Sequence, residues 1–464
     1  MAIPASVQKV LDEWNVEYSI SDGFQNERTM IETGFGTTPG NYAKVIFLKD
    51  TAGKVQVVIP ANRMLDLNLI SHQTGRQFSA VPPEELAQLK RQLGLDDFPA
   101  LPQLTRLDSL VDRSLLEYSE LFIQTGHGDQ HLSMPTDQFR ALTASSQIGN
   151  YTAALQIDVL HNDASADQED VHAAVEQFTP LRIQQRLQDT LDLPPLPETA
   201  RKIIELRVDP DADTVTLART IEVDPSIAAQ VMSWARSPYY RSRGNINTVE
   251  EAVLRVLGFD LVMNLSLGLA LGRTLSVPRE GPHGYTPFWQ QAVMGAALAS
   301  ELTRKIKGKK KPDSGLAYLC GLLHNFGYLV LGQVFPPQFS LINRHIEANP
   351  HINRFYIERH LLGLCREQMA SLLLGQWNLP AEAVLAIRQQ HNPFYCGDHD
   401  NYAQLLYVTT RALRQRGYGD GPVEALDPNV LDALGLTQET VDEVADELIE
   451  HVGELADMVT ALSS

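Results

Sequence analysis

The sequence predicts a multidomain protein, with an α+β N-terminal domain whose sheet is mostly antiparallel and an all-α helical domain after it. Its 464 residues are too many for one ordinary hydrophobic core, so two or three domains are expected. Near residue 155 the apolar pattern also changes, from short β-rich runs to residues spaced three and four apart. We place the parts of the chain at 1–155, 156–178, 179–395 and 396–464.

The N-terminal part mixes strand and helix signals. The runs "YAKVIFLKD" and "KVQVVIP" are separated by "TAG", which predicts a β-hairpin. The stretch "PPEELAQLKRQLG" has helical spacing and a glycine stop. Further strands are expected in "RLDSLVDRSLLEYSELFIQTGHGDQHLSMP", around a hairpin turn at Gly126, His127 and Gly128. A role of His127 as a general base is the alternative interpretation of that turn.

Beyond this part, the segment 156–178 is acidic and polar, which is typical of an exposed linker or a solvated helix. Helix start signals then recur at Asp224, at Thr248 with Glu251, and at Pro380. Apolar residues spaced three and four apart follow each of them. Because no fixed-period repeat is evident, the pattern favours a compact helical domain over a solenoid.

The C-terminal extension 396–464 ends in an amphipathic helical pattern. We expect its apolar stripe to pack on its own domain, with helix pairing between two chains, and hence an oligomer, as the alternative. The stripe consists of Val441, Val444, Leu448, Val452, Leu455 and Val459.

The formal net charge of −19 repels nucleic-acid backbones as a whole and favours a cytoplasmic protein. The dense basic stretch "TRKIKGKKKP" at 303–312 is interpreted as a lysine-rich loop between helices, with phosphate binding as the alternative. Cys320, Cys365 and Cys396 show no paired metal spacing and make no disulfide framework, so a reducing compartment is implied. No signal sequence is recognised at the start of the chain.

Residues 315–335, "GLAYLCGLLHNFGYLVLGQVF", are nearly all apolar but carry His324 and Asn325 at their centre. The polar pair and the absence of a basic flank favour a buried helix over a membrane span. A His-Asp doublet in such a helix, joined by histidines from neighbouring helices, can hold a divalent metal that activates water for phosphoester hydrolysis. Here Asn325 replaces the carboxylate, so metal affinity should fall sharply.

The helical part resembles the HDOD domain, an output domain related to the HD phosphohydrolases. The resemblance runs over about 180–395 and is carried by "LPPLPETARKIIEL", "IEVDPSIAAQVMSWARSPYY", "NTVEEAVLRVLGFDLVMNLSL", "FWQQAVMGAALASEL", "AYLCGLLHNFGYLVL" and "LLLGQWNLPAEAVLAIRQQHNP". It implies bacterial signalling or regulation, in which the domain is a scaffold or output module that binds a protein partner.

Transferred by position, the resemblance places a degraded metal site on this domain. Gln291 and Cys365 stand where HD-type proteins often have histidine, Asn325 stands for the aspartate, and His324 and His391 remain. These residues make a poor site for a hard metal. We therefore expect no catalytic metal and no cofactor, and we expect His324 and Asn325 to be hydrogen-bonded core residues. A zinc site using the Cys365 thiolate is the alternative.

The N-terminal part resembles the YbaK and prolyl-tRNA-synthetase-associated editing domain, which removes amino acids from mischarged tRNA. The runs "VQKVLDEWNVEYSI", "YAKVIFLKDTAGKVQVVIPANRMLDL" and "LVDRSLLEYSELFIQTGHGDQHLSMP" carry this resemblance. It places Lys44 on the functional lysine and Asp112 on an acidic position of the family. Lys44 would stabilise an oxyanion or bind the terminal phosphate; a solvated lysine on an amphipathic strand is the alternative.

One departure from the editing family concerns its glycine-rich loop, which has no clean counterpart in "LGLDDFPALPQLTR". Asp96 and Asp97 would repel a tRNA phosphate there. We therefore expect a weak or lost deacylase whose pocket senses a small ligand or a tRNA-related cue.

Three hypotheses about function follow. The first is a signalling protein in which the editing-like domain senses a ligand and the HDOD domain binds a protein partner. An aminoacyl-tRNA deacylase with a regulatory helical domain comes second. A metal-dependent phosphohydrolase comes last.

Overall fold

The computed structural model describes residues 3–22, 40–128, 130–155, 164–178, 196–240, 246–278, 281–283, 285–308 and 310–463. The chain divides into two compact units. We call the first, Met1–Ile157 with Gly281–Gly284 and Ser340–Leu361, the N-terminal unit. The second, Asp158–Glu280 with Tyr285–Phe339 and Leu362–Ser464, is the helical unit.

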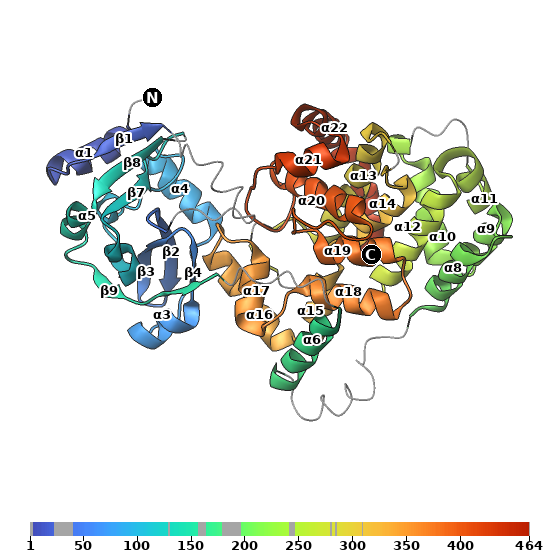
Figure 1. Ribbon diagram of the computed structural model, residues 1–464, viewed down its shortest axis with the longest axis horizontal. Helices are drawn as coiled ribbons and strands as arrows, with labels where there is room; N and C mark the ends of the chain where they lie inside the picture. Colours follow the sequence, from blue (N-terminus) through green and yellow to red (C-terminus); the bar gives the residue numbers. More distant parts are fainter. Residues whose placement is uncertain are drawn as a thin grey trace. The chain divides into compact units, whose positions relative to one another are not determined.

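The N-terminal unit is an α+β domain, as predicted (Figure 1). Its strands are β1 (Ser19–Asp22), β2 (Ala43–Asp50), β3 (Gly53–Pro60), β4 (Arg63–Leu65), β5 (Ser79–Ala80), β6 (Asp108–Asp112), β7 (Glu120–Gln124), β8 (Gln130–Pro135), β9 (Gln147–Gly149) and β10 (Thr152–Ala154). Its helices and 3₁₀ turns are α1 (Ala5–Glu13), α3 (Leu67–Thr74), α4 (Pro83–Leu93), α5 (Thr136–Leu142), η1 (Pro102–Leu104) and η2 (Arg113–Glu117).

Most strand pairs are antiparallel, which confirms the predicted sheet. The predicted hairpin is β2 and β3, with Asp50 opposite Gly53. The turn at 126–128 joins β7 to β8, also antiparallel. The larger sheet has the order β5-β2-β3-β6-β9, and in it β3 pairs parallel with β6 and β6 parallel with β9. These two parallel pairings, which need long connections, were not predicted.

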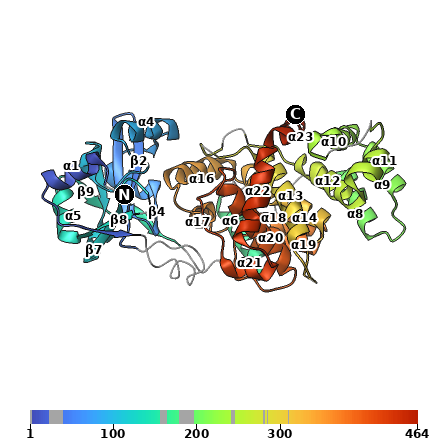
Figure 2. The ribbon, with the colours of Figure 1, turned by 90° about the horizontal axis from the view of Figure 1, so that it is seen from above.

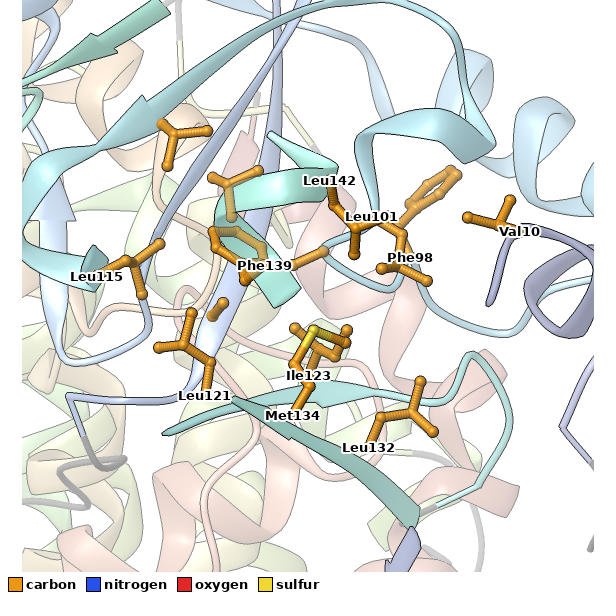
Figure 3. Close-up of a cluster of buried hydrophobic side chains, with 14 of the residues drawn as sticks. Val10, Phe98, Leu101, Leu115, Leu121, Ile123, Leu132, Met134, Phe139 and Leu142 are labelled. Atoms are coloured by element: carbon orange, nitrogen blue, oxygen red, sulfur yellow. The ribbon is translucent and has the colours of Figure 1, made fainter. Parts of the chain in front are cut away.

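A hydrophobic core lies between β7, β8 and helix α5. Ile123 and Met134, from the two strands, gather with Phe139 of α5 (Figure 3). All three side chains are fully buried. Truncating Phe139 would remove one of the largest side chains of this core, at a cost of about 3–5 kcal/mol.

Residues 340–361, which we call the inserted segment, belong to the N-terminal unit although they lie deep in the helical part of the sequence. They comprise most of α16 (Pro336–Ala348) and α17 (Arg354–Leu362) and the connection between them. Ala348 is fully buried in a core cluster with Leu65, Leu67 and Tyr151. The segment is thus part of the core of this unit.

The helical unit is all-α, and Figures 1 and 2 show α12, α13 and α14 side by side at its centre. Its first helices and turns are α6 (Ala164–Phe178), α8 (Glu198–Val208), α9 (Thr214–Glu222), α10 (Pro225–Arg236), η3 (Pro238–Tyr240), α11 (Val249–Ala252), the π turn η4 (Val253–Leu257), α12 (Phe259–Gly272) and α13 (Phe288–Lys305). The others are α14 (Ser314–Leu323), α15 (Phe326–Val334), α18 (Arg366–Gln376), α19 (Ala381–Gln389), α20 (Asp400–Arg414), α21 (Pro428–Leu434), α22 (Gln438–Glu450) and α23 (Val452–Ser463).

The predicted helix starts of this unit are confirmed. The Asp224 carboxylate accepts hydrogen bonds from the first backbone N–H groups of α10. The Thr248 hydroxyl accepts from the backbone N–H of Glu251, and the Glu251 carboxylate accepts from the backbone N–H of Asn247, the residue before the cap. Pro380 immediately precedes α19. The side chains of Asp224 and Thr248 satisfy N–H groups that the helix itself leaves free, whereas Pro380 makes no side-chain cap.

Among the described residues one stretch, Ser314–Val334, is apolar and long enough to cross a membrane, but 89% of its most apolar window is buried inside the protein. The stretch comprises α14 and α15, which meet at the His324-Asn325 doublet. The stretch packs closely against α13, because a Cβ on Gly321 would collide with the backbone of Gly295 in that helix. The stretch is a buried helical pair of the core.

Two other segments also pack on the helical unit. Within the predicted acidic linker, residues 164–178 form α6, which packs on α18 and carries Asp167, a buried partner of Arg388 at 2.5 Å. In the C-terminal stripe, Val441 and Leu448 are buried, and α22 packs on α13. The stripe is therefore covered by its own domain.

Candidate functional site

The His324-Asn325 doublet lies where α14 ends and α15 begins. Both side chains are buried. His324 Nδ1 lies 2.7 Å from the Gly321 carbonyl oxygen, so the ring donates from Nδ1. Gln390 Nε2 donates to the His324 carbonyl oxygen at 2.8 Å. The Gly321 carbonyl oxygen thus orients the imidazole, and the Gln390 side chain holds the main chain of His324.

Asn325 makes hydrogen bonds through both ends of its amide. Its Nδ2 donates to Gln291 Oε1 of α13 at 3.3 Å. Its Oδ1 accepts from Arg366 Nη1, at the start of α18, at 3.2 Å. Two of the predicted vestigial positions, Gln291 and Asn325, are therefore in contact, and Asn325 links three helices through its side chain.

Arg366 is one of three charged residues at this point that sequence reasoning missed. It is only 2% exposed, and its Nη1 lies 3.5 Å from Asp420 Oδ2. Arg414, also buried, lies 3.2 Å from the other oxygen of Asp420. The Arg366 guanidinium also lies 5.1 Å from the ring centroid of Tyr328. One feature of the sequence could have pointed to Arg366: it directly follows Cys365, which stands at a position of the metal-site motif.

We define the arginine cluster as Gln291, Asn325, Arg366, Arg414 and Asp420. Two guanidinium groups face one carboxylate, so the cluster carries a net positive charge. Beside it lies a small cavity of about 10 Å³. That volume is roughly enough for one water molecule. The lining residues are Gln291, His324, Thr410, Leu413, Arg414, Tyr418, Gly419 and Asp420.

Cys365 and His391 make contacts of other kinds. Cys365 precedes α18 as its cap: its Sγ accepts from the backbone N–H of Gln368, whose Oε1 accepts from the Cys365 N–H at 2.9 Å. His391 Nε2 lies 3.1 Å from Glu367 Oε1, and both side chains are buried. These contacts define a helix cap and a buried polar pair.

The arginine cluster does not fit a divalent metal. Asn325 Oδ1, the oxygen that replaces the family's carboxylate, already accepts a hydrogen bond from the Arg366 cation. A metal ion at that oxygen would meet a positive charge within hydrogen-bond distance of its ligand. Among the described residues, no group of three or more His, Cys, Asp and Glu side chains is arranged to hold a metal ion.

The predicted site residue of the N-terminal unit, Lys44, lies on β2 opposite Ile59 of β3. Burial lowers the pKa of its ammonium, with Lys90 acting in the same direction and Asp97 opposing them. Within the described part of the chain, no hydrogen bond or ion pair reaches Lys44. A partly buried cation without a partner is costly, so an anionic or carbonyl group would be bound favourably here.

The Asp112 carboxylate is buried and holds neighbouring elements together through hydrogen bonds. It is 2% exposed, and its carboxylate accepts from the backbone N–H groups of Ser114 and Tyr151 at 3.0 and 2.8 Å. The Thr152 hydroxyl donates to it at 3.0 Å. These bonds tie η2 and β10 to the end of β6, and they occupy both carboxylate oxygens.

The two acids that sequence reasoning expected to repel phosphate both have basic neighbours. Asp96 lies 2.6 Å from His127 Nδ1, and Asp97 lies 3.2 Å from Lys90. The backbone N–H groups of both acids point to the Gly126 carbonyl oxygen. Gly126 has φ of 98°, and a Cβ there would collide with Leu95. The hairpin turn thus packs against the loop, and the Lys90 ammonium partly compensates the negative charge of the loop.

Comparison with known proteins identifies the class. An HDOD domain matches residues 193–393, and an aminoacyl-tRNA editing domain matches residues 28–142. The molecule is therefore a two-domain protein that joins an editing-type domain to an HDOD domain.

A solved structure from Marinobacter aquaeolei VT8, assigned provisionally to signal transduction, is 42% identical, covers 100% of both chains and has a TM-score of 0.90. The chain belongs to the same family as that protein. An HDOD domain protein of unknown function from Geobacter sulfurreducens is 18% identical and covers 63% of this chain and 98% of its own, with a TM-score of 0.46. A curated, uncharacterized protein of Treponema pallidum (strain Nichols) is 25% identical over 204 residues, which span 43% of this chain and 38% of that protein.

Proposed function

We propose that this protein is a regulatory protein, in which the editing-type domain senses a ligand and the HDOD domain is a non-catalytic module that binds a protein partner. The arginine cluster carries the proposal. At the position where an HD-type enzyme would hold its metal, Arg366 and Arg414 face Asp420 in the core. A buried, paired set of charges supports a fixed scaffold. The relative from Marinobacter aquaeolei is also assigned provisionally to signal transduction.

The ligand side of this proposal depends on Lys44. Its partly buried ammonium is available to an anionic or carbonyl oxygen, such as those of an aminoacyl-tRNA 3′ end or a related small molecule. Filter binding of the full chain with a panel of mischarged tRNAs tests this. We expect retention that is lost in Lys44→Ala, together with a deacylation rate equal to that of buffer alone. Absence of retention for the whole panel would contradict ligand sensing through tRNA.

A second candidate function is an aminoacyl-tRNA deacylase. The same observation supports it, because a lysine whose pKa is lowered by burial can stabilise a developing oxyanion. Turnover of a mischarged tRNA above the buffer rate, abolished in Lys44→Ala, would establish it. An equal rate for both proteins would eliminate it.

The metal-dependent phosphohydrolase has no support from the geometry of the arginine cluster. Elemental analysis of purified protein, before and after incubation with Mn²⁺, Mg²⁺ or Zn²⁺, tests this conclusion. We expect less than stoichiometric metal in every case, because Arg366 occupies the oxygen that would bind the ion.

Binding of a protein partner by the HDOD domain, and formation of an oligomer through the C-terminal helices, stay proposals. Sedimentation analysis of the purified full chain tests the second. A concentration-dependent dimer that is unaffected by charged substitutions on the exposed face of α22 would argue against an interface there.

A further inference from the structure

We propose that the inserted segment, residues 340–361, completes the Lys44 site, and that His351 in this segment contacts a ligand carrying an α-amino-acid group. This inference rests on the proposed function of the N-terminal unit as a ligand sensor. It assigns a binding residue to a part of the chain that lies within the HDOD match at residues 193–393.

Buried hydrogen bonds hold the inserted segment on β4. Asn349, fully buried, accepts from the Leu65 N–H at 2.7 Å and donates to the Leu65 carbonyl oxygen at 2.9 Å. Its side chain therefore pairs with the strand as a neighbouring backbone would. The ring of His345, also fully buried, accepts from the Leu67 N–H at 3.2 Å through Nε2, because Nδ1 lies 2.9 Å from the Leu341 carbonyl oxygen.

A second attachment centres on Asp66, which caps α3 through the N–H groups of Asn68 and Leu69. His360 Nε2 lies 2.8 Å from one oxygen of Asp66, and His345 Nε2 lies 3.7 Å from the other. Burial would raise the pKa of Asp66, but the hydrogen bonds from His360 and from the backbone N–H groups of Leu69 and Asn68 outweigh it and hold the pKa well below its ordinary value. Asp66 is therefore a carboxylate that binds α17 of the segment through His360.

His351 lies at the Lys44 end of the β2–β3 hairpin. His351 Nε2 lies 3.3 Å from the Arg63 carbonyl oxygen, so the ring donates from Nε2. Arg63 follows the turn after Pro60, which lies opposite Ala43, and the Ala61 N–H donates to the Tyr42 carbonyl oxygen. Burial, and next the positive charge of Lys44, lower the pKa of His351 to about 3. The ring is thus neutral, and it lies within range of an electrostatic interaction with the Lys44 ammonium.

The Lys44 ammonium and the Nδ1 atom of His351 are both available to a ligand. Within the described residues, Lys44 has no hydrogen-bonding or ion-pairing partner, and His351 Nδ1 is buried with none. One group is a cationic donor and the other a neutral acceptor. A ligand that satisfies both needs a carboxylate or carbonyl oxygen for Lys44 and an N–H donor for His351. An α-amino-acid group offers both within a few bonds, whether as a free amino acid or as an aminoacyl ester.

Calorimetric titration of the full chain tests the proposal. One arm uses a panel of free amino acids, and the other uses 3′-aminoacylamino-3′-deoxyadenosines, stable analogues of the charged tRNA end. The test variant is His351→Gln, whose amide N–H keeps the bond to Arg63 but removes the Nδ1 acceptor. Glu347→Gln, in the same segment, is the matched control, and Lys44→Ala is the reference for loss of the site.

We expect binding in one arm, no binding in Lys44→Ala, affinity reduced about tenfold in His351→Gln, and wild-type affinity in Glu347→Gln. Binding that depends on Lys44 but is unchanged in His351→Gln would overturn this inference and leave the proposed function intact. No binding by the wild type in either arm would overturn the inference, and then the tRNA filter assay decides the proposed function separately.

A second measurement covers the case in which His351→Gln fails to fold. In wild-type protein labelled with ¹⁵N-histidine, the Nδ1 resonance of His351 should move when the ligand is added, because Nδ1 gains a donor. An unchanged resonance at saturating ligand would contradict the contact.

Discussion

At the scale of single residues, the arginine cluster is a set of buried polar and charged side chains that links helices of the helical unit. The neutral Asn325 amide accepts a hydrogen bond from the Arg366 cation. Asp420 pairs with both guanidinium groups, and Glu424 lies 3.7 Å from the Arg414 guanidinium. Breaking such a set by removing one partner costs more than the set contributes as a whole, because a buried charge remains.

We therefore expect Arg366→Met to lower the free energy of unfolding of the helical unit by about 3 kcal/mol. The remaining pair of Arg414 and Asp420 keeps the loss at the lower end of the usual range. Denaturant unfolding followed by circular dichroism measures it. In the double variant with Asp420→Asn, the loss should increase further, because Arg414 then lacks its carboxylate partner at 3.2 Å. A single variant within 1 kcal/mol of the wild type would show that the Arg366 charge does not stabilise the helical unit.

His351 provides a prediction about pH. Its pKa is lowered to about 3 in the folded protein, whereas the unfolded chain binds the proton near the ordinary value of about 6.5. Between these values the unfolded state binds more protons, so the stability contributed by neutral His351 is present at pH 7 and is lost as the pH falls. From pH 7 to 5 the loss is about 2 kcal/mol at most.

The measurement compares wild type and His351→Gln by denaturant unfolding of the full chain at pH 7, 6 and 5. The wild type should lose stability relative to the variant across this range. Asp66 does not interfere, because a carboxylate with a lowered pKa loses its contribution only below the ordinary range near pH 4. Parallel pH profiles for both proteins would mean that His351 titrates normally.

Some properties of the candidate residues can be predicted from the sequence, and others depend on contacts that form only in the folded chain. The residue types at Asn325, Gln291 and Cys365 can be read from the sequence, and they predict a poor site for a hard metal. The cluster of Arg366, Arg414 and Asp420 could not be predicted, because Asp420 lies in a loop and contacts Arg366 only in the folded chain. The same holds for His351, whose proximity to Lys44 depends on contacts across about 300 residues of sequence.

At the scale of elements, local signals were reliable and long-range pairings were not. The β2–β3 hairpin, helix α4 with its stop at Gly94, and the caps of α10 and α11 depend on neighbouring residues and were predicted. The parallel pairs of β6 depend on where long connections return, which no local pattern fixes. The inserted segment is of the second kind, because its helical pattern does not say which core will bury it.

The attachment of the inserted segment to β4 predicts the effect of Asn349→Leu. The variant leaves the buried N–H and C=O of Leu65 without partners, at a cost of about 2–4 kcal/mol. Native-state hydrogen exchange should show faster exchange in β4 and α3 and unchanged exchange in α12–α14. Glu347→Gln, also in the inserted segment, should leave β4 protection as it is. Equal protection of β4 in Asn349→Leu and the wild type would show that the amide pairing is not needed.

At the scale of the whole molecule, the domain matched from sequence and the unit formed in space differ. The HDOD match covers residues 193–393 continuously, whereas residues 340–361 within it bury their side chains in the N-terminal unit. The chain therefore leaves the helical unit and returns to it through this segment. Phe339 and Leu362, which flank the segment in the sequence, belong to the helical unit.

This arrangement predicts that a fragment of residues 158–464 will not retain the structure of the inserted segment. His345, Ala348 and Asn349 are fully buried in the full chain, and the fragment lacks the strands and helix α3 that bury them. Trypsin should cut the fragment after Arg354, which is 1% exposed in the full chain and protected there. Cleavage after Arg304, exposed on α13 of the helical unit, should proceed at equal rates in both proteins and is the internal control. If Arg354 is equally protected in both, the segment folds with the helical unit alone, and its assignment to the N-terminal unit is wrong.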